Sequence, residues 1–254
     1  MVGKKMGLVV FSLVLIAVLF IYFNFKRVNY ELTEYEERLI RYFNEVALQS
    51  EYNDNPQRII KWRKPMILYV HKDGVYESQM QMIHQTINDI NELATDGFKI
   101  VLSEDISECN AFLYLCNKEK VAELNPDFYQ SFDDGIVDDD FSGLAYVEFN
   151  WSNYNINKVL IYIDSEDPID VQKSTILEEI TQSIGLPNDP KTYSNSIFYE
   201  DKSEEDVIIN RFSEMDSDIV RLLYHPKMKP GLNFKQVEKV IKRILKEESE
   251  KGYK

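Results

Sequence analysis

The N-terminal part of the chain contains a long run of apolar residues. Residues 6–23 carry no charged side chain, and their number is about what a helix needs to cross the hydrocarbon core of a bilayer. The run ends in aromatic residues followed by Lys26 and Arg27, whereas a cleavable signal peptide would end in small residues. The pattern therefore predicts an uncleaved single-pass membrane anchor, with the globular part outside the cytoplasm.

Beyond this run, helical and strand-like patterns follow one another along the chain. Helices are expected where apolar residues recur every three to four positions, and strands where short apolar runs are closed by turn residues. The expected helices are residues 32–49, 77–93, 206–223 and 233–246, and the expected strands are 65–70, 98–102, 111–115, 142–149 and 158–163.

Three of these segments have more specific signals. Thr33 and Glu36 have the spacing of a capping box at the start of the first helix. Residues 142–149 alternate in polarity, as in an edge strand, whereas the continuous apolar run 158–163 suits the centre of a sheet. The acidic segment 124–140 is expected to be irregular. The predicted divisions are an anchor at 1–27, a linker and helix at 28–60 and a globular domain at 61–254.

Residues 175–190 have the most distinctive spacing in the sequence. A helical pattern ends there at a glycine; Glu178 and Gln182 are four residues apart, and Asn188 follows the glycine by three. This is the spacing of the zinc-protease motif H-E-x-x-H-x-x-G-x-x-H, with Glu, Gln and Asn in place of the three histidines. Glu179 stands at the position of the general base in that motif.

These side chains make a poor ligand set for zinc. They offer one carboxylate and two neutral amide oxygens, whereas catalytic zinc sites use histidines that the i and i+4 spacing aims at one point. Without a metal, a water molecule beside Glu179 would not be acidified, so Glu179 is catalytic only if the protein is active as an enzyme. We therefore expect no metal and no cofactor. On spacing alone, an ordinary amphipathic core helix explains the segment equally well.

Composition narrows the choice of partners. The formal net charge of −14 repels nucleic-acid phosphates, so nucleic-acid binding is disfavoured. The two cysteines, Cys109 and Cys116, flank an apolar run that reads as one strand, which would keep them too far apart for a disulfide. The absence of a C-x-x-C pair disfavours cysteine-bound zinc and thioredoxin-like redox chemistry.

The order of the predicted elements matches that of zincin-like metalloproteases. The block Leu177–Asp189, with residues 194–198 and 223–232, resembles the bacterial domain-of-unknown-function 2927 family, which is related to those proteases. The resemblance covers roughly residues 60–250. It implies an α+β fold, with a zincin-like mixed sheet, packed helices and a helical C-terminal part after one transmembrane helix. If residues 223–232 correspond to the methionine turn of metzincins, Met228 would lie beneath the former metal position.

The sequence thus supports three hypotheses about function. The first is an anchored, extracytoplasmic domain without zinc catalysis whose cleft, near Glu178, Gln182, Asn188, Asp189 and Met228, binds a peptide or an envelope component. The second is a hydrolase with oxygen ligands for a metal and Glu179 as the general base. The third is a structural or signalling protein that meets its partner through its acidic surface. An open strand edge at 144–149 beside Glu179 would favour the first.

Overall fold

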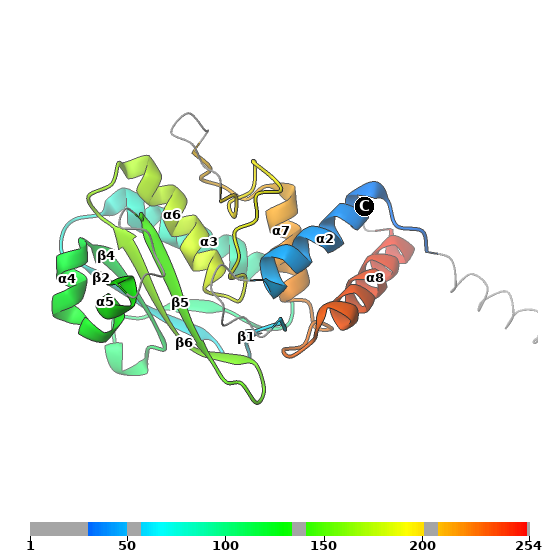
Figure 1. Cartoon of the computed structure of the whole chain (residues 1–254), viewed down its shortest axis with the longest axis horizontal. Coiled ribbons are helices and arrows are strands. Elements are labelled where there is room, and N and C mark those ends of the chain that lie inside the picture. Colours follow the sequence, from blue (N-terminus) through cyan, green and yellow to red (C-terminus); the bar gives the residue numbers. More distant parts are fainter. Residues whose placement is uncertain (1–29, 50–56, 134–140, 201–207, 253–254) are drawn as a thin grey trace, which may run out of the picture.

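The computed structural model of the protein describes residues 30–49, 57–133, 141–200 and 208–252 (Figure 1). Within these ranges, a sheet with helices on both faces adjoins a group of three further helices. The helices are α2 (Glu34–Leu48), α3 (Glu77–Leu93), α4 (Lys118–Leu124), α5 (Pro126–Asp133), α6 (Ile169–Gln182), α7 (Glu214–Leu223) and α8 (Phe234–Lys251), with a short 3-10 helix, η1 (Ile106–Glu108). The strands are β1 (Lys61–Trp62), β2 (Met66–Lys72), β3 (Ile100–Leu102), β4 (Ala111–Cys116), β5 (Gly143–Phe149) and β6 (Asn155–Asp164).

Most of the strand pairs are parallel. β3, β2, β4 and β6 are neighbours in that order and pair in parallel, and β1 pairs in parallel with the start of β6. β5 is the exception, because it runs antiparallel to β6. The α+β class predicted from the sequence is therefore wrong. Parallel neighbours need crossover connections, so helices such as α3, between β2 and β3, are interleaved with the strands, which makes this an α/β sheet.

The two faces of the sheet bury different side chains. Alternate residues of β4 point to opposite faces: Leu113 and Leu115 join the main core with α3 and α6, whereas Tyr114 and Cys116 join a smaller cluster with α4 and α5. The smaller cluster is rich in aromatic rings, including Phe128, Phe132 and Tyr162. Aliphatic residues on one face and aromatic residues on the other therefore hold helices on both sides of the same strands.

The group of α2, α7 and α8 continues the main core beyond the end of the sheet (Figure 1). Each of the three helices begins with a reciprocal capping box, formed by Thr33 and Glu36 in α2, and by Ser213 and Asp216 in α7. Asn233 and Gln236 form the capping box of α8. Such caps satisfy backbone N–H groups that a helix start leaves without a partner. The capping box predicted at Thr33 is confirmed.

A buried lysine joins the sheet to this helical group. The side chain of Lys61 in β1 is 0% exposed, and its ammonium group donates to Asp96 Oδ2 at 2.8 Å and to the backbone oxygens of Leu223 and Met228. It also lies 4.4 Å from the centre of the Tyr224 ring. Burial lowers the pKa of Lys61 to about 8, against the opposing effect of Asp96.

Trp62, the residue after Lys61, extends this junction to α6. Trp62 Nε1 donates to Ser183 O at 3.1 Å, and the Tyr224 hydroxyl donates to Ile184 O at 2.8 Å. The same hydroxyl accepts the backbone N–H of Trp62. The two-residue strand β1 therefore fixes the end of α6 against the turn that follows α7.

Several elements differ from the sequence prediction. Part of the segment expected to be irregular forms α5, and neither β1 nor α4 was predicted. The expected helix 77–93 and the edge position of 142–149 are confirmed, and Cys109 and Cys116 are both free thiols. No helix in the described ranges is long and apolar enough to span a bilayer. The anchor predicted at residues 6–23 lies outside those ranges, so it and the extracytoplasmic location stay predictions from the sequence.

We expect Lys61→Met to lower the free energy of unfolding by about 3–5 kcal/mol, because it leaves the buried Asp96 carboxylate without its cation. Urea unfolding of the full chain, followed by circular dichroism, would measure this loss. Lys64→Met is the matched control, because Lys64 is exposed close by and its loss should cost little. Equal losses in the two variants would contradict the role given to Lys61.

The stability difference between wild type and Lys61→Met should widen between pH 8 and 10.5. Lys61 releases its proton at about pH 8 in the folded state and near its ordinary value of 10.5 in the unfolded chain. The unfolded state therefore binds more protons in this window, and wild-type stability gains roughly 1–3 kcal/mol relative to the variant as pH rises. Parallel curves for the two proteins from pH 7 to 10 would contradict the lowered pKa.

Candidate functional site

Helix α6 carries the distinctive spacing found in the sequence. The helix stops just before Gly185, which has a φ of +114° in the left-handed region that favours glycine. A Cβ atom at this position would lie 2.2 Å from the backbone oxygen of Ile60. The glycine therefore both ends the helix and lets it pack directly against the chain that leads into β1.

The residues of the predicted cleft are only partly brought together. Gln182 Nε2 donates to both carboxylate oxygens of Asp189 at 2.7 Å, so these two side chains form one unit after the helix end. Asn188, between them in sequence, is buried, and Glu178 is half-buried. Met228 is buried in the turn after α7, and its backbone oxygen accepts a hydrogen bond from Lys61.

Glu179 lies where α6 meets β5. Its side chain is 7% exposed, and its Cγ would be 3.0 Å from a Cβ atom added to Gly143 at the start of β5. Thr175 lies one turn earlier on the same face of α6, and its Cγ2 would be 2.3 Å from that added Cβ atom. The absence of a side chain at Gly143 thus lets the helix stripe that bears Glu179 approach the edge strand.

Histidine, cysteine and carboxylate groups do not form a metal-binding cluster within the described ranges. The buried Glu179 and Thr175 lie beside Gly143 at the start of β5, whereas the pair of Gln182 and Asp189 lies at the C-terminal end of α6. What the arrangement offers chemically is a polar helix stripe next to the start of a strand edge.

The outer edge of β5 has backbone groups available for pairing. The N–H of Asp164 in β6 donates to Ser142 O at 2.8 Å, and the antiparallel register continues from Gly143 opposite Ile163. Because such a ladder alternates, residues 144 and 146 direct their N–H and C=O groups to β6, whereas residues 143, 145 and 147 direct theirs outward. In the part of the chain that the structure describes, β6 is the only strand that pairs with β5.

This edge has few of the features that keep strand edges from pairing. Between Gly143 and Val147 there is no lysine and no proline, and the local irregularity comes only at Glu148 and Phe149. Glu148 itself is paired with Lys158 at 3.0 Å. Natural proteins usually protect an exposed edge with charges, proline or a bulge. The first five residues of β5 are therefore a suitable template for another strand.

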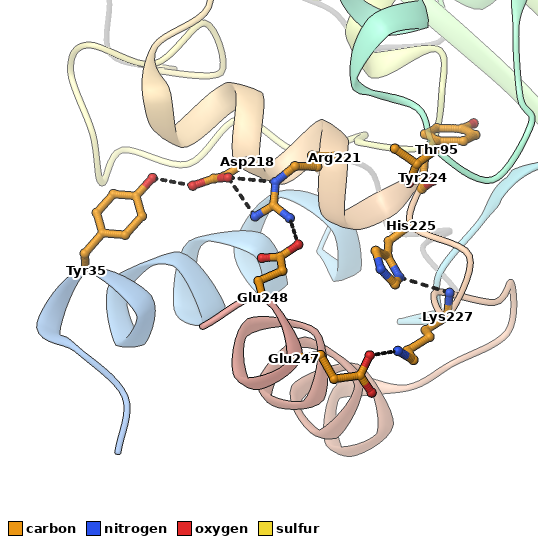
Figure 2. Close-up of polar contacts among 9 residues, drawn as sticks. All are labelled: Tyr35, Thr95, Asp218, Arg221, Tyr224, His225, Lys227, Glu247 and Glu248. Atoms are coloured by element: carbon orange, nitrogen blue, oxygen red, sulfur yellow. Dashed lines mark hydrogen bonds and ion pairs between the residues drawn. The ribbon is translucent and has the colours of Figure 1, made fainter. Parts of the chain in front are cut away.

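A separate groove lies between α2, α7 and α8 (Figure 2). The groove has a volume of about 950 Å³. Its lining includes the apolar residues Leu39, Ile244 and Leu245 and several polar side chains that contact one another. The Tyr35 hydroxyl donates to Asp218 Oδ2 at 2.7 Å. A further groove of about 970 Å³ lies between α2 and the start of α8. None of the site residues predicted from the sequence lines either groove.

Hydrogen bonds and ion pairs between polar side chains in the groove link all three helices. The Arg221 guanidinium donates to Asp218 Oδ1 through Nε at 3.0 Å and Nη2 at 2.8 Å, and its Nη1 reaches Glu248 of α8 (Figure 2). Lys227 is paired with Glu247, the residue before Glu248 in α8. Burial and the Asp218 hydrogen bond raise the pKa of Tyr35, so it stays a neutral donor at physiological pH.

His225 sits beside these ion pairs in a defined protonation state. Its Nδ1 accepts the backbone N–H of Lys227 at 3.1 Å, which leaves the ring proton of the neutral form on Nε2. Burial, together with the positive charges of Lys227 and Arg221, lowers the pKa of His225. Its neighbours in the groove are already paired with one another, so the groove primarily connects the helices.

The groove was not predicted from the sequence, because the residues that meet in it are far apart in the chain. Tyr35 and Asp218 are separated by 183 positions, and neither belongs to a recognisable motif. The capping box at Thr33 and the amphipathic patterns of the last two helices were visible, but they do not show which charged side chains would meet.

Comparison with known families identifies the family of this chain. The chain matches the family DUF2927, described as a protein of unknown function, over residues 36–243, and it belongs to this family. The resemblance inferred from the sequence is therefore confirmed, whereas no finding confirms the relation to zincins. No match was found among curated proteins.

We expect Arg221→Gln to lower the free energy of unfolding by about 1–2 kcal/mol, because one guanidinium joins α7 to α8 and satisfies Asp218. Arg243→Gln is the control: Arg243 is 71% exposed and pairs with Glu247 within one helix, so its loss should cost less than about 0.5 kcal/mol. Urea unfolding of both variants would measure the two losses. A cost for Arg221→Gln no larger than that for Arg243→Gln would contradict the bridging role.

Proposed function

We propose that this member of the DUF2927 family binds an extended peptide by adding it as a strand to β5. The supporting observation is the edge from Gly143 to Val147, where residues 143, 145 and 147 direct backbone N–H and C=O groups away from β6. In strand addition, main-chain hydrogen bonds supply the affinity and alternate side chains supply the specificity.

The opposite edge of the sheet is less suitable. β3 has only three residues, Ile100–Leu102, and η1 follows shortly after it. β5 has seven residues and lies beside the polar stripe of α6, so a peptide there would meet both backbone and side-chain groups.

The groove between α2, α7 and α8 is better explained as a connection between these helices than as a binding site. The Arg221–Glu248 ion pair joins α7 to α8, and the Lys227–Glu247 ion pair joins the turn after α7 to α8. Tyr35 is engaged with Asp218. A ligand would have to replace these contacts, whereas a strand at β5 would use outward backbone groups. The hydrolase hypothesis with Glu179 as general base rests on the motif spacing in the sequence.

Ala145→Pro should weaken peptide binding while leaving the fold intact. Residue 145 points its N–H outward, so proline removes a donor from the binding edge and not from the ladder with β6. The probe is the hexapeptide acetyl-(Thr-Val)3-amide, titrated calorimetrically into the full chain in mild detergent. We expect binding to weaken at least about tenfold, since one or two hydrogen bonds of about 1 kcal/mol are lost.

Ala145→Ser is the matched control, because it keeps the N–H group and should bind as wild type does. Circular dichroism melting of Ala145→Pro tests whether the sheet is preserved. Equal affinity of the proline and serine variants would contradict strand addition, and so would the absence of saturable binding to the wild-type chain.

A further inference from the structure

We infer that β5 pairs with β5 of a second copy of this chain, antiparallel and about a two-fold axis between the two Ala145 residues. Each copy then covers the edge to which the other would bind a peptide. The inference rests on the edge used for the proposed function and adds a partner that controls access to it. It follows from the symmetry of residues 143–147, their lack of charge and the exposure of Tyr146.

The regular part of the β5 edge is symmetric about Ala145. Residues 143, 145 and 147 direct their N–H and C=O groups outward, and the ladder with β6 becomes irregular between Glu148 and Phe149. When two antiparallel copies place Ala145 opposite Ala145, residue 143 of each copy lies opposite residue 147 of the other. Every outward backbone group of this stretch then gains a partner, whereas a register shifted along the strand leaves some of them without one.

The side chains on the two faces of such a pair are complementary in size. Ala145 and Val147 pack on the main core on the α6 side, so on this side the small Ala145 meets itself and Val147 lies opposite Gly143, which has no side chain. On the other side, Leu144 lies opposite Tyr146 of the second copy. Tyr146 is 46% exposed in the single chain. Pairing therefore covers apolar surface that one copy leaves in water.

The charge distribution lets two copies meet at this edge although the chain as a whole is acidic. Residues 141–147 contain no acidic or basic side chain, whereas the formal net charge of the chain is −14. Glu148, which borders this stretch, is paired with Lys158 at 3.0 Å. Local pairing is thus free of like-charge contacts, while the two copies repel each other at longer range. We therefore expect a weak dimer that strengthens when salt screens this repulsion.

Pairing with a second copy and binding of a peptide exclude each other. Both use the outward N–H and C=O groups of residues 143, 145 and 147. A peptide must therefore displace the second copy, so the apparent affinity for the peptide falls as the protein concentration rises.

The experiment is sedimentation equilibrium of the full chain in a density-matched mild detergent. We expect a monomer–dimer equilibrium with a Kd of roughly 10 µM, and tighter association at about 300 mM than at about 50 mM NaCl. The peptide acetyl-(Thr-Val)3-amide should shift the equilibrium towards the monomer. A chain that stays monomeric up to about 200 µM overturns the inference, and so does a dimer that binds the peptide without dissociating.

Variants of Tyr146 locate the pairing at β5. In Tyr146→Lys, the two copies of residue 146 are diagonal neighbours with like charge, so association should weaken at least about tenfold. An equimolar mixture of Tyr146→Lys and Tyr146→Glu should associate at least about fivefold more tightly than either variant alone, because the diagonal neighbours then have opposite charges.

Trp151→Lys is the matched control for this pairing. It removes another exposed aromatic side chain, 60% exposed, and introduces the same charge outside residues 143–147, so it should associate as wild type does. Equal weakening by the two lysine variants, or a mixture that associates no more tightly than either variant alone, overturns the two-fold pairing.

Calorimetry with the same peptide separates this inference from the proposed function. A monomeric wild-type chain that binds the peptide overturns the pairing and leaves strand addition standing. If the Tyr146 variants locate a dimer at β5 but the wild-type chain binds no peptide at any concentration, the proposed function fails and the pairing stands.

Discussion

The arrangement of the whole protein depends on the burial of one ammonium group. A charge taken out of water must find compensating partners, and Lys61 finds them in Asp96, two backbone oxygens and the face of Tyr224. These partners come from two separate parts of the chain, the segment after α3 and the turn after α7. The geometry of the junction is therefore stricter than apolar packing alone would require, because a shift of either part would remove some of the partners of the buried ammonium group.

The junction around Lys61 also fixes the position of α6, and with it the candidate site. β1 holds the last turn of α6 through Trp62 and Tyr224, and Gly185 allows the close contact that this requires. Once the end of α6 is fixed, its Thr175 and Glu179 stripe lies against Gly143. The helix stripe beside the start of β5 is thus positioned by contacts at the C-terminal end of α6, so the proposed binding edge is held in place by the fold itself.

The sequence allowed the long periodic elements to be predicted, and the elements it missed have physical reasons. Residues 77–93 form a helix with the predicted bounds because a regular apolar stripe faces the sheet. β1 was not predicted, since two residues carry no periodicity and burial of Lys61 depends on partners as far as 167 positions away. The α+β assignment failed because strand direction depends on how chain segments pair in space. At the site, the proximity of Glu179 to β5 depends on Gly143, whose role is visible only once the strand lies under the helix.

The long separation between Lys61 and its partners also has a consequence for the order of folding. Lys61 reaches Leu223 across 162 positions, and the parallel pairing of β1 with β6 joins Lys61 to Asn155, 94 positions away. Such contacts form slowly, because the chain must close a large loop before it gains their stabilisation. During synthesis, β1 cannot reach its final environment until the segment after α7 has left the ribosome. The local helices α3 and α6 can form earlier, so closure of the sheet onto the C-terminal turn is expected to be the late, rate-limiting event.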